Sequence, residues 1–138
     1  MKLSDKGQSL VELAVSLTIL IYLLSGAIEF GIAFFQYVQL RDAAQEGALY
    51  GSVCQDPAQI EARARGASSE PIDLAGPDVE FFYEYVTDTP EGAIQVTLVY
   101  QHKIFMPFMT TILQSSHISL RAAVTNTILT TEGCSNGL

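Results

Sequence analysis

A run of 23 residues near the N-terminus, residues 13–35, contains a single ionisable side chain, Glu29. As an α-helix this run would be roughly 34 Å long, enough to cross a hydrocarbon core of about 30 Å. The remaining residues are too few to wrap such a helix completely, so a buried core helix is the weaker interpretation. We therefore expect residues 8–35 to form a transmembrane helix in contact with the lipid bilayer.

The charges on the two sides of this run predict its orientation. Lys2 and Lys6 precede it, whereas residues 36–138 carry 5 basic and 12 acidic side chains. The positive-inside rule predicts a single-pass protein with a cytoplasmic N-terminus and an exported acidic domain, residues 36–138. The net charge of −8 and the lack of a basic cluster in the sequence argue against nucleic-acid binding.

The exported part shows a helical pattern first and strand patterns afterwards. Helical character continues to about residue 52, and Asp56-Pro57 opens a short helix over residues 57–67. One face of the long helix is made of small or slender residues: Leu40, Ala44, Gly47 and Gly51. Apolar and polar residues then alternate in three strand-like runs, at about 78–86, 93–102 and 117–129. The expected fold is α+β and pilin-like, with the long N-terminal helix packed on a small antiparallel sheet.

Two cysteines, Cys54 and Cys134, follow the membrane segment. An exported domain meets oxidising conditions, so one disulfide between them is the simplest expectation. The bridge would close a loop of about 80 residues and stabilise the fold by roughly 4 kcal/mol. Neither cysteine belongs to a CxxC motif, and His102 and His117 lie 15 residues apart on expected strands. We therefore expect no metal site and no cofactor.

The residues before the apolar run resemble the processing signal of type IV prepilins. Gly7 is followed by Gln8-Ser-Leu-Val-Glu12, so a short basic leader, a glycine and a glutamate stand directly before the helix. The resemblance implies that a prepilin peptidase removes the leader, residues 1–7, by cutting between Gly7 and Gln8. A glutamate at the membrane edge is costly unless it is paired, and the new α-amine gives Glu12 of a neighbouring subunit a partner.

A longer stretch is similar, almost end to end, to the N-terminal region of the TadE-like family. The matching segments are residues 7–12, 27–31 (AIEFG) and 43–48 (AAQEGA). Members are minor pseudopilins of tight-adherence (Flp-type) pilus systems. The resemblance implies a structural protein of the inner membrane, active in cell adhesion with other pilus subunits and a membrane assembly platform. Many relatives carry arginine at three positions where this chain does not: Ile32, Gln45 and Leu49.

Glu29 belongs to a polar stripe on the apolar helix. At 100° per residue the stripe falls within a sector about 60° wide. Its members are Thr18, Tyr22, Ser25, Glu29 and Gln36. A charge on a lipid-length helix normally faces another helix, so we expect the stripe to contact a pilus or platform subunit. The alternative is that Glu29 lies near the outer surface and extends its carboxylate into water.

Other features of the exported part point to no catalytic site. An acidic run is better explained as a solvated sheet face than as a calcium site, because its spacing fits no EF-hand loop. Its members are Asp78, Glu80, Glu84, Asp88 and Glu91. The segment Phe105-Met-Pro-Phe-Met109 either closes the core under a crossover or forms an exposed patch for a partner. No catalytic motif is present in the sequence, so we expect neither an enzyme nor a small-molecule substrate.

Two other classes of protein share some of these features. One is an extracytoplasmic binding domain, secreted or membrane-anchored, because Ser25-Gly-Ala27 offers signal peptidase I a small-x-small site. That interpretation must explain why the helical pattern runs straight through the site. The other is a single-pass receptor ectodomain, for which the seven-residue leader provides no cytoplasmic signalling region.

Overall fold

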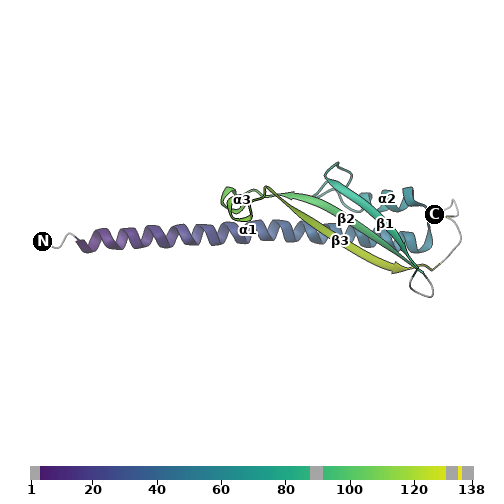
Figure 1. Ribbon diagram of the computed structural model, residues 1–138, viewed down its shortest axis with the longest axis horizontal. Coiled ribbons are helices and arrows are strands. Elements are labelled where there is room, and N and C mark those ends of the chain that lie inside the picture. The colour runs from purple at the N-terminus through teal and green to yellow at the C-terminus, as the bar shows by residue number, and fades with distance from the viewer. Residues whose placement is uncertain (1–3, 88–91, 130–133, 135–138) are drawn as a thin grey trace.

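The structure, a computed structural model, describes residues 4–87, 92–129 and 134, with side chains from Gly7 onward. Its elements in chain order are α1 (Ser4–Val53), α2 (Pro57–Gly66), β1 (Val79–Val86), β2 (Ala93–Lys103), α3 (Pro107–Leu113) and β3 (His117–Thr127). In Figure 1, α1 runs along the whole molecule, and its N-terminal half projects alone beyond the sheet. The expected α+β fold is confirmed.

Helix α1 is one continuous element of 50 residues. It starts at Ser4 rather than at residue 8, because Gly7 costs a helix only about 1 kcal/mol relative to alanine and does not stop it. The helix is long and apolar enough to cross a membrane, and none of its most apolar 18-residue window is buried in the structure. A core helix of a soluble domain would have buried that window.

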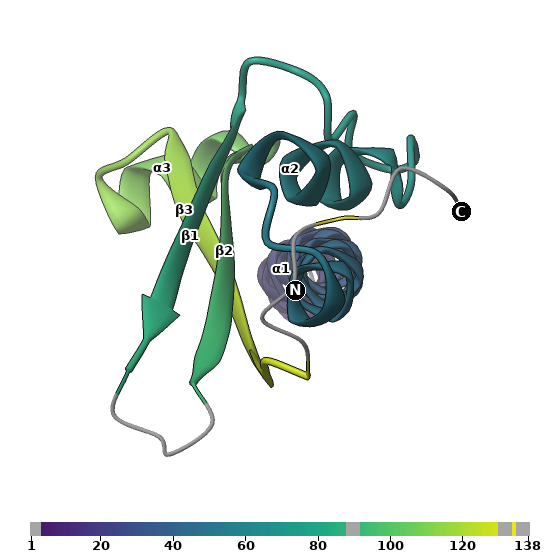
Figure 2. The same ribbon diagram turned by 90° about the vertical axis from the view of Figure 1, so that its right-hand side faces the viewer.

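The sheet contains three antiparallel strands in the order β1-β2-β3. The registers pair Tyr83 with Val96 between β1 and β2, and Val96 with Val124 between β2 and β3. Figure 2 looks along α1 and shows the sheet on one side of the helix, with α2 next to both. Because α1 packs on β2 and β3, the edge strand β1 is less covered, and its Tyr83 and Tyr85 stay partly exposed.

The core lies where the small-residue face of α1 meets β2 and α2. The fully buried positions on this face are Leu40, Ala43, Ala44 and Ala48. The two glycines allow the closest approach: a Cβ at Gly47 would lie 3.0 Å from Ala64 Cβ, and one at Gly51 would lie 2.6 Å from Ile94 Cδ1. The expected packing of this face on the sheet is therefore confirmed.

The far end of α1 is tied to the C-terminal part of the chain. Cys54 forms a disulfide with Cys134, the pairing expected from the sequence, with the two Cα atoms 4.8 Å apart. Beside it, the backbone N–H of Leu129 donates to the carbonyl oxygen of Ser52 at 2.8 Å. The chain leaving β3 is thus attached to the end of the same helix that crosses the sheet.

Replacing Gly51 by leucine should destabilise the domain by at least about 2 kcal/mol, because the new side chain overlaps Ile94 in a packed core. The matched control is Gly31→Leu on the same helix, where no atom lies within 4 Å of a new Cβ. The measurement is pulse proteolysis of detergent-solubilised protein across a urea series. Equal urea midpoints for the two variants would contradict the close approach of α1 to β2.

Candidate functional site

The expected processing residues lie at the start of the uncovered part of α1. Gly7, Gln8 and Glu12 are all exposed, and nothing lies within 4 Å of a Cβ placed on Gly7. Gln8 and Glu12 are four residues apart on one helix, so their side chains lie on the same face. The Gly7–Gln8 peptide bond and the Glu12 carboxylate are therefore accessible in the folded chain, at the end farthest from the sheet (Figure 1).

A second site surrounds the acid of the apolar helix. The Glu29 side chain is only 4% exposed, and its Oε1 atom lies 3.0 Å from Nε2 of His102. The same oxygen accepts the backbone N–H of Phe105 at 3.0 Å. His102 stands near the end of β2 and is 3% exposed. We call Glu29, His102 and the Phe105 amide the carboxylate junction, because they join α1 to the chain between β2 and α3.

Part of the polar stripe is covered by the chain itself. The Tyr22 ring packs on the Phe108 ring of α3, with centroids 4.9 Å apart, and Ser25 is half-buried. Gln36 is buried two turns beyond Glu29, whereas Thr18 is exposed and bonds to the Ala14 carbonyl oxygen of its own helix. In the structure the Glu29 carboxylate is buried and does not extend into water, unlike in the alternative interpretation. Contact of the stripe with a partner helix stays a prediction.

Two acceptor atoms in this region have no hydrogen-bond partner among the described residues. They are Oε2 of Glu29 and Oε1 of Gln36, both buried on the covered face of α1. A buried carbonyl or carboxylate oxygen without a donor costs about 1–3 kcal/mol. The junction therefore uses only one of the two oxygens of the Glu29 carboxylate.

His102 was the functional residue that we did not identify from the sequence. The alternation along β2 contains a signal for it, because even-numbered residues such as Ile94, Val96 and Leu98 face the helix and are buried. His102 has the same parity, and a buried acid on the opposing helix requires a donor. These two arguments place His102 on the helix-facing side of β2, but they do not say which residue of α1 lies opposite it.

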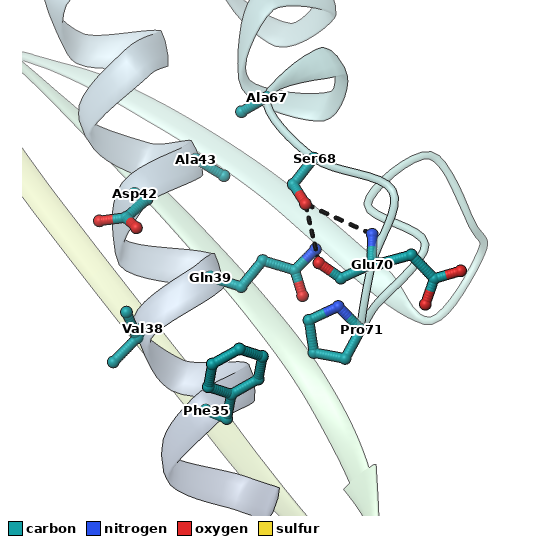
Figure 3. Close-up of a pocket in the computed structure, with 9 residues that line it drawn as sticks. All are labelled: Phe35, Val38, Gln39, Asp42, Ala43, Ala67, Ser68, Glu70 and Pro71. Atoms are coloured by element: carbon teal, nitrogen blue, oxygen red, sulfur yellow. Dashed lines mark hydrogen bonds between the residues drawn. The ribbon is translucent and has the colours of Figure 1, made fainter.

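An open groove lies farther along α1, between the helix and the residues after α2. Its volume is about 270 Å³, below the range of about 300–1,000 Å³ that is usual for ligand pockets. Figure 3 shows the Gln39 side chain reaching across it. The Gln39 amide donates to the Ile72 carbonyl oxygen and accepts the Ile72 N–H, both at 2.8 Å. These bonds hold the loop on α1, and the groove offers no set of groups for catalysis.

The acidic residues of β1 follow the expected sheet face. Asp78, Glu80 and Glu84 are exposed, whereas Asp88 and Glu91 lie outside the described residues. In residues 4–87, 92–129 and 134 there is no group of three or more His, Cys, Asp or Glu side chains that could hold a metal ion.

Removal of the Glu29 carboxylate should loosen the connection between β2 and α3. In Glu29→Ala the His102 ring and the Phe105 N–H lose their acceptor, and we expect a loss of about 1–3 kcal/mol in the free energy of unfolding. Glu29→Gln keeps one oxygen for the Phe105 N–H and should be milder. The measurement is the rate of limited proteolysis between residues 104 and 116.

The control for this prediction is Glu46→Ala, which removes an exposed acid from the same helix. Its cleavage rate should equal that of the unmodified protein. The carboxylate junction is refuted if Glu29→Ala is cleaved no faster than Glu46→Ala.

The comparisons with known proteins agree with the resemblance seen in the N-terminal region. Residues 7–49 match the family model of TadE-like proteins. The match includes Gly7, Glu12, Glu29 and much of the small-residue face, whereas His102 and the sheet lie beyond it. Comparison with curated proteins and with solved structures gives no significant match.

Proposed function

We propose that this chain, with its TadE-like residues 7–49, is a minor pseudopilin of a tight-adherence (Flp-type) pilus system. The observation that carries the proposal is the position of the Gly7–Gln8 bond. It is exposed at the start of an uncovered apolar helix, and that helix continues without a break into the folded domain. Processing at this bond would leave the whole anchor on the mature protein.

The proposed sequence of events follows from this arrangement. The cytoplasmic leader is removed by a prepilin peptidase at the inner membrane, and the α-amine of Gln8 becomes the new N-terminus. Glu12 of a neighbouring subunit then neutralises this amine, since a carboxylate and an ammonium group attract strongly in an apolar environment. The uncovered apolar surface of α1 supplies the contact with lipid and with other pilus or platform subunits.

The rival proposal is a binding domain released by signal peptidase I after Ala27. Three observations favour the pseudopilin. Helix α1 is continuous through this position, Ser25 and Gly26 are half-buried, and Tyr22 on the N-terminal side packs on Phe108 of the domain. A cut after Ala27 would remove a residue that contacts the folded domain.

Mass spectrometry of intact protein extracted from membranes separates these proposals. The mature chain should begin at Gln8, have 131 residues and keep the whole apolar run of residues 13–35. An N-terminus at residue 28 or later would refute the pseudopilin and favour the secreted domain. Two variants sharpen the test, because each enlarges the small residue that one of the two peptidases requires. Gly7→Leu should block processing, and Ala27→Leu should leave it unchanged.

Glu12 should serve assembly rather than cleavage. Glu12→Gln keeps the shape of the side chain but removes the charge that would pair with the new α-amine. We expect normal removal of the leader and a reduced recovery with the assembled pilus apparatus. The measurement is co-purification, normalised to processed protein in the membrane, with Glu46→Gln as the exposed-acid control. Recovery at the level of the control would exclude the amine-pairing role.

A further inference from the structure

Helix α3 and its flanks form an uncharged apolar surface beside the uncovered half of α1. Phe105 is 80% exposed, Ile112 is 68% exposed and Leu113 is also exposed. No ionisable residue occurs between Lys103 and His117. Exposed aromatic and aliphatic side chains in such number indicate an interaction surface rather than an ordinary solvated turn.

Several polar groups of this segment are hydrogen-bonded within the chain. The hydroxyls of Thr110 and Thr111 both donate to the Pro107 carbonyl oxygen, at 2.7 and 3.2 Å. The backbone N–H of Phe105 donates to Glu29, and that of Ile104 donates to the Ser116 carbonyl oxygen at 3.0 Å. A segment can enter an apolar environment only if its backbone groups are paired in this way.

The position of α3 along α1 relates this surface to the bilayer. The Tyr22–Phe108 ring contact and the carboxylate junction hold α3 beside residues 22–29 of α1. Figure 1 shows α3 as the part of the domain nearest to the projecting half of the helix. From Gln8 to the last residue before this contact, α1 would span only about 21 Å, which is shorter than a hydrocarbon core of about 30 Å. From Gln8 to Glu29 it spans about 33 Å, which matches the core.

We propose that Phe105 and the outer face of α3 insert into the outer leaflet of the membrane that α1 spans, with the carboxylate junction at the boundary of the hydrocarbon. The occupant of the surface is lipid, because the surface carries no charge and continues the apolar surface of α1. Two elements, α1 and the α3 segment, then attach the exported domain to the membrane. This inference rests on the membrane anchoring in the proposed function.

The test uses the absence of tryptophan from the sequence. Single variants Phe105→Trp and Ile112→Trp of the full-length protein are reconstituted in phosphatidylcholine vesicles that contain a mixture of lipids brominated at shallow and at deep positions of the acyl chain. We expect strong quenching and a blue-shifted emission at both positions. Phe82→Trp is the matched control, since Phe82 is an exposed aromatic on the sheet, and it should show neither effect. Free-thiol counting on each variant confirms that the Cys54–Cys134 disulfide is intact.

A fourth variant, Leu20→Trp, reports on the anchor itself, because Leu20 is exposed on the uncovered half of α1. If Leu20→Trp is quenched while Phe105→Trp and Ile112→Trp behave like Phe82→Trp, the α3 inference is wrong and the anchoring stands. If Leu20→Trp is not quenched, the anchoring fails, and the inference fails with it. Quenching of Phe82→Trp to the same extent would also overturn the inference, because the domain would then lie on lipid without a defined face.

Discussion

The burial of the Glu29 carboxylate against His102 and the Phe105 amide is the interaction that positions the other elements. An acid in an apolar helix must have hydrogen-bond donors, and here a strand and the turn after it provide them. The donors come from residues more than 70 positions later in the chain, so the junction sets how far the sheet and α3 reach along α1.

Other contacts hold the domain against α1 along the rest of the helix. Gly47 and Gly51 let β2 and α2 approach the helix axis, Gln39 holds the loop after α2, and the disulfide attaches the C-terminal part of the chain at Cys54. These attachments are distributed from Glu29 to the end of the helix.

The surface of α1 has a part that the domain covers and a part that it leaves exposed. Beyond residue 22 one face of α1 is covered within the chain, by α3, the sheet and α2, whereas Leu23, Phe30 and Phe35 stay exposed. The half before residue 22 is uncovered and largely apolar, and it carries the exposed Glu12. The exposed apolar surface of α1 thus continues to Phe35, and α3 lies beside residues 22–29 of this stretch.

Local patterns in the sequence determined the elements of this protein. The apolar run, the period-two alternation, the Asp56-Pro57 cap and the small-residue face all act between near neighbours, so the helix, the three strands and the packing face could be predicted. The processing motif and the TadE-like resemblance also lie within one continuous stretch. Only the tertiary structure decided where the polar stripe points. Contact of the stripe with a partner helix stays a prediction, whereas within the chain the hydrogen-bond partners of Glu29 come from the end of β2 and from a backbone amide. That choice depends on strand register and on the length of the turn after β2, which no local pattern encodes.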